Sequence, residues 1–322
     1  MFDEDSRLKL FLYAAIFLTV LGYTGRYVGL EPLHNQFLVF AVWAYILFID
    51  NINYRFSGSS LAVSRTGEFL VLALWSLAIS CVFELLNLRL GAWYYTGQPA
   101  TISTRWLGLA LGRASFLPGL FITAELLKTF GLFRGLKSNP VPVTRRMLRC
   151  SYYTGAVLLL LALAAPGLFW PLAGCAFFFL AEPLNYRLGV ASLLREWEGG
   201  LPGKTLRLAS AGLVCGFLWN AWNTAAGAQW GYLLKFPGPE AFGLPLPAYL
   251  GFALFALQAY SLYSLASSLR GGRTWEEGAW PMPGRLPGLR AQYASALFII
   301  VTFYITCRAV DAHTIRLYIA WI

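Results

Sequence analysis

The chain carries little charge. Asp, Glu, Lys and Arg make up 12% of its 322 residues, whereas hydrophobic residues, including Met and Cys, make up 58%. Soluble domains carry roughly 25% charged residues, and these side chains lie mostly on the water-facing surface. A chain of this length cannot build a soluble surface from so little charge. The composition therefore predicts a polytopic membrane protein of the all-α class.

Potential metal ligands are also scarce. The chain has two His and five Cys, and it contains no C-x-x-C or H-x-x-x-H pattern. Zinc sites, haem attachment and disulfide frameworks all depend on such spacings. We therefore expect no metal and no cofactor. The excess of 25 Lys and Arg over 15 Asp and Glu is typical of orientation signals in a membrane protein, so we expect no nucleic-acid partner.

Long apolar runs predict the membrane spans, since a helix needs about 20 predominantly apolar residues to cross a bilayer. The N-terminal segment "MFDEDSRLKLF" is acidic, unlike the basic start of a signal peptide, so the first run is expected to remain as a helix. Nine spans are predicted, at 8–29, 36–54, 67–89, 105–127, 150–166, 168–187, 204–225, 246–269 and 291–310. Pro166 and Gly167 predict a tight hairpin between the fifth and sixth spans.

The basic residues predict the orientation. Eighteen of the 25 Lys and Arg fall on one alternating side of the nine spans, six fall on the other, and Arg113 lies within a span. Lys and Arg accumulate on the cytoplasmic side of membrane proteins. We therefore expect a multi-pass protein of the bacterial inner (cytoplasmic) membrane, with its N-terminus in the cytoplasm and its C-terminus outside.

Two pairs of segments suggest an internal duplication. "DNINYRF" (Asp50–Phe56) aligns with "EPLNYRL" (Glu182–Leu188), and "FELLNLRLGAWYY" (Phe83–Tyr95) aligns with "WNAWNTAAGAQWGY" (Trp219–Tyr232) after one insertion. The offsets are 132 and 136–137 residues. Four spans per copy is an even number, so both copies would enter the membrane from the same side, as parallel repeats do.

The expected organisation follows from this duplication. Residues 1–132 form the first four-helix repeat, and 133–149 form a basic cytoplasmic loop. Residues 150–269 form the second four-helix repeat, and 270–290 form another cytoplasmic loop. Residues 291–322 hold the ninth helix and the C-terminus.

Two acids lie near the predicted cytoplasmic ends of the second and sixth spans, each with an Arg five residues later. We expect a polar network at each helix end, in which acid, Asn and Arg satisfy one another. A paired acidic site formed by the two copies is the alternative. The residues of these networks are Asp50, Asn53, Arg55, Glu182, Asn185 and Arg187.

Glu84 lies within apolar sequence near the far end of the third span, and Arg113 lies about two turns into the fourth. Helical rise places the two at similar depth. Because either charge alone would be costly in a membrane, we predict a Glu84–Arg113 ion pair. Such a pair has two possible roles. It could simply hold two helices together, or it could hold Glu84 ready for proton transfer as a general acid, with Arg113 as its partner.

Several aromatic and amide side chains follow the ends of the third and seventh spans. The aromatic residues Trp93, Tyr94, Tyr95, Trp230 and Tyr232 fit an interfacial belt best, with a wall that stacks on a ligand as the alternative. The candidate ligand-binding residues are Asn87, Trp93, Asn220, Asn223 and Trp230.

The segments "WNAWNTAAGAQWGY" and "FGLPLPAYLGFALFALQAYSLY", between Trp219 and Tyr263, resemble the membrane domain of the small, heterodimeric-type bacterial lycopene cyclases. That family carries Asp-Ala-Trp, then Gly-x-Trp, then a Pro-led helix with paired glutamates. The resemblance implies an isoprenoid-binding, proton-driven cyclase without redox cofactors. Here Asn220 replaces the family Asp, and Ala248 and Tyr249 replace the glutamates, which leaves Glu84 as the acid in register in the first copy. "FELLNLRLGAWYY" also resembles segments of other bacterial polytopic membrane proteins.

Three classes of function remain open. The first is an isoprenoid- or lipid-handling protein, such as a carotenoid-type cyclase or hydratase with Glu84 as general acid. The second is a non-catalytic structural or pigment- or lipid-binding subunit of a membrane complex, which would have protein partners. The third is a transporter. The chain also resembles the UbiA-type prenyltransferases in span number, but one acid in each polar motif is too few for a magnesium–diphosphate site.

Overall fold

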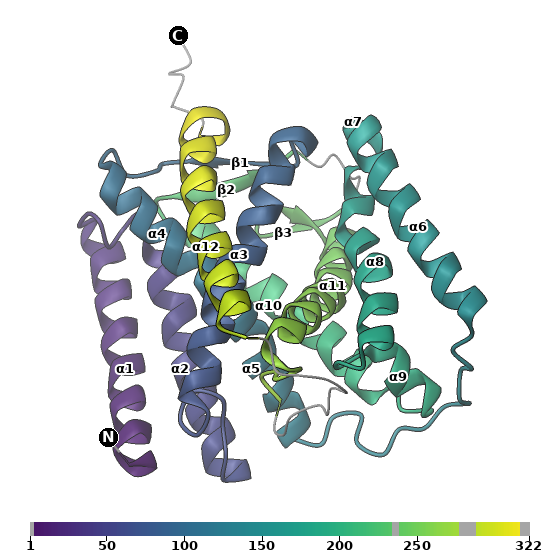
Figure 1. The fold of residues 1–322 in the computed structure, drawn as a ribbon. Helices are drawn as coiled ribbons and strands as arrows, with labels where there is room; N and C mark the ends of the chain where they lie inside the picture. Colours follow the sequence, from purple (N-terminus) through teal and green to yellow (C-terminus); the bar gives the residue numbers. More distant parts are fainter. Residues whose placement is uncertain (1–2, 234–237, 277–287, 316–322) are drawn as a thin grey trace.

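The computed structural model describes residues 3–233, 238–276 and 288–315. The chain is mostly helical, as its composition predicts (Figure 1). The long helical elements are α1 (Glu4–Val28), α2 (Phe37–Ser57), α3 (Thr66–Leu90), α4 (Ile102–Ala114), α5 (Phe116–Thr129), α6 (Arg145–Ala164), α8 (Ala173–Leu188), α10 (Gly203–Ala225), α11 (Leu250–Ser267) and α12 (Leu289–Ala309).

Short elements connect them. These are β1 (Trp93–Thr96), α7 (Pro166–Phe169), η1 (Trp170–Leu172), α9 (Leu193–Glu198), β2 (Gln229–Tyr232), β3 (Glu240–Ala241), β4 (Leu244–Pro245), η2 (Leu246–Tyr249), η3 (Ser268–Arg270) and η4 (Val310–Thr314). Strand β1 pairs with β2, and β3 pairs with β4, each antiparallel.

Within the described residues, eight helical segments are long and apolar enough to cross a membrane, which identifies a multi-pass membrane protein. They match the predicted spans except the seventh. In that place α10 is a helix of 23 residues, but it is not one of the eight. The expected hairpin between the fifth and sixth spans is present, since α6 ends at Ala164 and α7 begins at Pro166. Of the predicted loop 270–290, residues 277–287 lie outside the described part, as do residues 316–322 of the C-terminal segment.

The helices divide into an outer and an inner group. In α1, α6 and α12, 22% or less of the most apolar stretch is buried, whereas the share is at least 50% in α2, α3, α4–α5 and α11. Each outer helix packs on one main neighbour: α1 on α2, α6 on α8 and α12 on α3. Figure 1 shows α1 and α6 at opposite edges of the bundle. The largest core cluster lies among the inner helices and α10.

The acids at the ends of α2 and α8 organise the turns that follow them. Asp50 accepts hydrogen bonds from the Ser60 hydroxyl at 2.7 Å and from the backbone N–H groups of Ala62 and Val63 at 2.9 and 3.2 Å. Glu182 accepts from the Ser192 hydroxyl at 2.8 Å and from the N–H groups of Leu193 and Leu194 at 3.0 and 3.3 Å. Both carboxylates are fully buried.

The two asparagines of the same motifs tie neighbouring helices together. The Asn53 amide donates to the carbonyl of Ile122 on α5 at 3.0 Å, and the Asn185 amide donates to the carbonyl of Ser261 on α11 at 2.8 Å. Arg55 and Arg187 are exposed and lie outside the contacts that hold the acids. The prediction that acid, Asn and Arg satisfy one another is therefore wrong: serine hydroxyls and backbone N–H groups satisfy the carboxylates, and the asparagines bond to neighbouring helices instead.

Candidate functional site

The fourth span is broken at Ser115, between α4 and α5. In a continuous helix the N–H of Leu117 would bond to the carbonyl of Arg113. Here the Ser76 hydroxyl of α3 lies between these groups, accepting from the Leu117 N–H at 2.9 Å and donating to the Arg113 carbonyl at 2.6 Å. A side chain inserted into the helical hydrogen bonds breaks a helix in this way. The break leaves Arg113 in the last turn of α4, facing α3.

Ser76, Ser80 and Glu84 follow each other at intervals of four residues, so they lie on one face of α3. Glu84 is 2% exposed, and its carboxylate forms an ion pair with the Arg113 guanidinium. The predicted Glu84–Arg113 pair is confirmed. Its position depends on the break in the fourth span, which the apolar run at 105–127 does not indicate.

Two aromatic residues of β1 complete the contacts of Glu84. The Tyr95 hydroxyl donates to Oε1 at 2.7 Å, and the Trp93 indole N–H lies 3.2 Å from Oε2. The Arg113 guanidinium also contacts the Tyr95 hydroxyl. All three neighbours of the carboxylate are donors, an arrangement that an ionised carboxylate satisfies fully. We call Glu84, Arg113, Trp93 and Tyr95 the charged pole.

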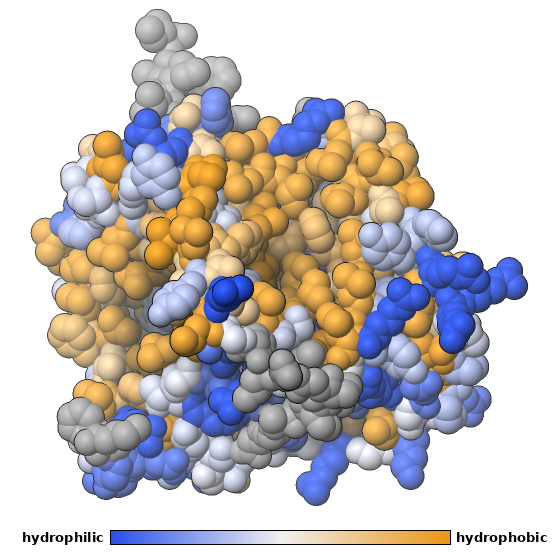
Figure 2. All heavy atoms as spheres, viewed as in Figure 1, coloured by the Kyte–Doolittle hydropathy of each residue, from blue (hydrophilic) through white to orange (hydrophobic). Residues whose placement is uncertain are grey.

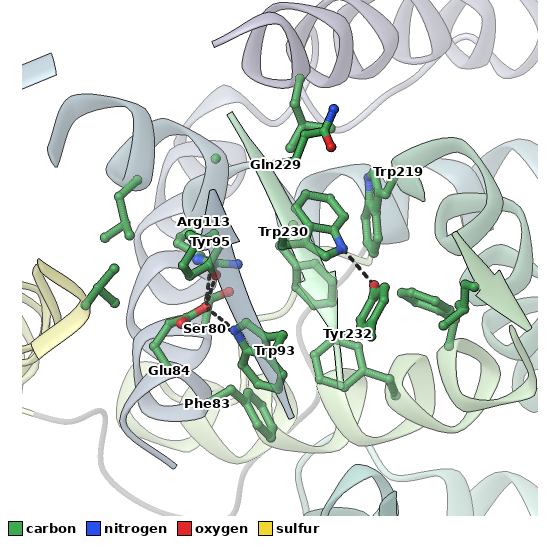
Figure 3. A pocket seen from close by; sticks show the side chains of 18 of the residues that line it. Ser80, Phe83, Glu84, Trp93, Tyr95, Arg113, Trp219, Gln229, Trp230 and Tyr232 are labelled. Carbon is green, nitrogen blue, oxygen red and sulfur yellow. Dashed lines mark hydrogen bonds and ion pairs between the residues drawn. The ribbon is translucent and has the colours of Figure 1, made fainter. Parts of the chain in front are cut away.

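The strands β1 and β2 bring the ends of the third and seventh predicted spans together. Trp93 lies opposite Tyr232, and Tyr95 lies opposite Trp230. Alternate residues of a strand face the same side, so these four rings share one face of the ribbon, which is directed into a cavity (Figure 3). The Trp230 indole N–H donates to the Tyr232 hydroxyl at 2.9 Å. We call Trp230 and Tyr232 the neutral pole.

Burial raises the pKa of Tyr232 to about 12. The phenol is therefore uncharged at any physiological pH. Asn220 lies against this hydroxyl, is fully buried and donates its amide to the carbonyl of Gly216 at 2.8 Å. The neutral pole thus offers a hydrogen-bonding group and two aromatic faces without a charge.

The cavity that both poles face has a volume of about 560 Å³. Small-molecule sites range over roughly 300–1,000 Å³. Apolar and aromatic side chains form most of its wall, including Phe83, Phe116, Trp170 and Phe252. Among the described residues that line it, Glu84 and Arg113 are the ionisable pair, and all other polar groups are neutral. Figure 2 shows this cavity as a hollow lined by hydrophobic residues in the side of the bundle.

The candidate ligand-binding residues have different places. Trp93 and Trp230 line the cavity, and Trp219 lies beside them, which corrects the expected interfacial belt for Trp93, Tyr95, Trp230 and Tyr232. Tyr94 is on the other face of β1, where its ring lies against Gly231. Asn220 stands behind Tyr232 and is not part of the wall.

Asn87 and Asn223 hold the strands and do not face the cavity. The Asn87 amide donates to the Trp93 carbonyl at 2.8 Å, and its oxygen accepts from the N–H of Ala92 at 2.8 Å. The Asn223 amide donates to the Trp230 carbonyl at 2.9 Å, and its oxygen accepts from the N–H of the same residue at 2.9 Å. Their amides are occupied by backbone groups, so each fixes the strand that carries the lining aromatics.

Sequence reasoning missed Ser76, Ser80, Gln36 and Gln229 as parts of this region. The four-residue spacing of the serines with Glu84 was a usable signal for the first two. Within the described ranges, no group of three or more His, Cys, Asp or Glu side chains could hold a metal ion.

Comparisons with known proteins give no relative: no family model, no curated protein and no solved structure matches the chain. The resemblance to the lycopene cyclases therefore stays a prediction.

Proposed function

We propose that this membrane protein binds an isoprenoid or a similarly apolar lipid inside the helical bundle. The cavity of about 560 Å³ that both poles face carries this proposal. Its wall is apolar and aromatic, as is usual for small-molecule sites, and a few polar groups are placed to orient one end of a ligand. Aromatic rings on both strands suit a polyene or an isoprene chain.

Mass spectrometry of small molecules that co-purify with the protein tests this proposal. The wild-type protein should carry one apolar molecule in a stoichiometric amount. Gly112 lines the cavity, and a Cβ there would meet only Val39, at 3.9 Å. Gly112→Phe should therefore fill the cavity and release the molecule.

Gly167 provides the matched control. It lies in α7 outside the cavity wall, and a Cβ there meets nothing within 4 Å. Gly167→Phe should retain the molecule. If the two variants retain equal amounts of the molecule, the molecule does not bind in the cavity.

A second candidate function is a cyclase or hydratase reaction with Glu84 as general acid, favoured by the place of this carboxyl in the cavity wall. Protonating an alkene needs a neutral carboxylic acid, whereas the resting contacts of Glu84 are those of a carboxylate. The reaction therefore requires a ligand-dependent separation of Glu84 from Arg113. The Glu84→Gln variant should still bind the ligand but accumulate it unconverted. Full conversion by this variant would show that Glu84 is not the general acid.

A non-catalytic pigment- or lipid-binding subunit uses the same cavity. It differs in two results: the bound molecule would be the same in wild type and Glu84→Gln, and stable protein partners would co-purify. A transporter would also use the break between α4 and α5, and its signature would be movement of the bound molecule between the two leaflets.

We further infer that the chain consists of two four-helix copies plus α12. Support comes from pairs of residues that make equivalent contacts in the two halves. These pairs are Asp50 and Glu182, Asn53 and Asn185, and Asn87 and Asn223. The packing of α1 on α2 and of α6 on α8 also corresponds. In this arrangement α10 is the seventh of nine spans, and the cavity lies between equivalent ends of the copies.

The orientation proposed for the protein has its N-terminus in the cytoplasm and its C-terminus outside the inner membrane. Figure 2 shows hydrophilic residues gathered at the end of the bundle where α1 begins. The excess of Lys and Arg on that side of the predicted spans supports the same orientation. Labelling of single cysteines placed in the 133–149 loop, from either side of the membrane, measures it directly.

A further inference from the structure

The position of the cavity in the bundle indicates how a ligand reaches it. At one end the β1–β2 ribbon covers it, with Trp93, Tyr95, Trp230 and Tyr232 facing inward (Figure 3). At the other end the wall reaches Phe116 and Trp219, whose rings lie 4.8 Å apart. Beyond Phe116 the bundle is solid, because Leu117, Leu120 and Phe121 are at most 1% exposed.

The side of the bundle is different. The cavity wall includes Phe83 and Leu90 on α3, Gly174 on α8, and Gly251 and Leu254 on α11. Gly251 is exposed and Leu254 is 49% exposed, so α11 takes part in both the wall and the outer surface. Figure 2 shows the hollow opening on this side among hydrophobic residues. Helices α3, α8 and α11 all belong to segments apolar enough to span a membrane.

Two glycines leave space at this rim. A Cβ added at Gly174 or Gly251 would meet no other atom within 4 Å. Side chains at these two positions would therefore extend into open space at the rim and not into packed structure. We call the opening bounded by α3, α8 and α11 the lateral opening.

The charges of the wall limit the chemistry of the ligand. Arg113 is the one cation among the described lining residues, and it is already paired with Glu84. A phosphate or diphosphate at the poles would need an unpaired cation or a helix N-terminus to replace the water that it loses, and the first turns of α8 and α11 line the cavity at the lateral opening, away from the strands. A hydroxyl, carbonyl or ring end group needs only a hydrogen-bonding partner, which the Tyr95 and Tyr232 hydroxyls and the indole N–H groups can supply.

We propose that the cavity is loaded from the hydrocarbon interior of the bilayer through the lateral opening, by a single-chain isoprenoid with a neutral end group. The end group lies between the charged and neutral poles, and the chain extends toward the opening. This inference rests on the proposed ligand-binding function and adds its entry route and the charge of its ligand.

The test uses the full-length protein in phosphatidylcholine vesicles that contain a diazirine-bearing geranylgeraniol. Samples are irradiated briefly at increasing times after the protein and the probe are combined. Peptide mapping then measures labelling of two regions: the cavity wall and the exposed outer face of α12. The wild-type protein should show time-dependent labelling of the wall near Trp93 and Trp230. Labelling of the α12 face reports ordinary contact with the bilayer and serves as the internal standard.

Variants at the lateral opening decide the route. Gly251→Phe and Gly174→Phe should slow cavity labelling by at least about tenfold, the effect of roughly 1.4 kcal/mol on the barrier, and leave labelling of α12 unchanged. Gly167→Phe, outside the opening, should behave as wild type. If cavity labelling is equally fast in the opening variants while α12 labelling is normal, the proposed route is wrong although the ligand-binding function stands.

Two further outcomes are distinct. A wild-type protein labelled on α12 but never in the cavity contradicts the ligand-binding function itself. A diazirine-bearing geranylgeranyl phosphate should label the α12 face but not the wall, and cavity labelling by this anionic probe equal to that by the alcohol would overturn the inferred neutral ligand.

Discussion

The two halves of the chain build similar local structures but place different chemistry in the cavity. In the first half, Asn87 holds β1, and Glu84 lies one turn before it on α3. In the second half, Asn223 holds β2, and Asn220 lies one turn before it on α10. Glu84 forms an ion pair with Arg113, whereas Asn220 lies against the hydroxyl of Tyr232. Two similar local frameworks can therefore present one charged and one neutral surface to the same cavity.

The helix ends show the opposite result. Asp50 and Glu182 differ in length, yet each accepts from a serine ten residues later and from two successive backbone N–H groups. These contacts organise the turns after α2 and α8 in the same way. At the cavity, by contrast, Glu84 forms an ion pair with Arg113, whereas Asn220 is uncharged.

The largest expected effect concerns the charge of the first half. Arg113→Ala should destabilise the protein by about 3–5 kcal/mol, because it leaves the carboxylate of Glu84 buried without a cation. Equilibrium unfolding in mixed detergent micelles measures the loss. The double variant Glu84→Gln with Arg113→Gln should recover much of the lost stability. If Arg113→Ala alone is as stable as wild type, Glu84 does not depend on Arg113 to compensate its charge.

The next effect tests the equivalence of the halves. Asp50→Ala and Glu182→Ala should each cost roughly 3 kcal/mol, since each leaves several buried donors without an acceptor. The same unfolding measurement applies to both. Glu182→Ala should be the more harmful of the two, because Glu182 also accepts from the Ser261 hydroxyl of α11 at 2.7 Å. A large loss for one variant and none for the other would break the equivalence.

The smallest effect compares the two poles directly. Tyr95→Phe removes a donor to a carboxylate and should cost about 1.5–3 kcal/mol, whereas Tyr232→Phe removes a neutral contact and should cost about 0.5–1.5 kcal/mol. Both changes keep the ring. Equal losses in the free energy of unfolding would mean that the hydrogen bond in the charged pole contributes no more than the one in the neutral pole.

The sequence predicted the parts of this structure that depend on composition and depth. The helical class, most span positions and the Glu84–Arg113 pair follow from apolar runs and from the rise of a helix. The break at Ser115 could not be found in this way, because it depends on the Ser76 hydroxyl of another helix. The aromatics were assigned to a belt because the strand pairing that turns Trp93 and Trp230 inward joins segments more than 130 residues apart.

The misplaced roles of Arg55 and Arg187 have a similar origin. Opposite charges five residues apart suggested a pair, but the serines at positions 60 and 192 were the usable signal, since they recur ten residues after each acid. A buried carboxylate is satisfied by whichever donors the following turn brings to it, and backbone N–H groups carry no sequence signature.

A high-resolution structure of the protein purified from its native membrane tests the central claim most directly. We predict elongated non-protein density in the cavity, with one end between Glu84 and Tyr232 and the other directed toward the opening bounded by α3, α8 and α11. A cavity closed by the protein's own side chains, with Glu84 and Arg113 apart and no density between the strands and Phe116, would contradict it.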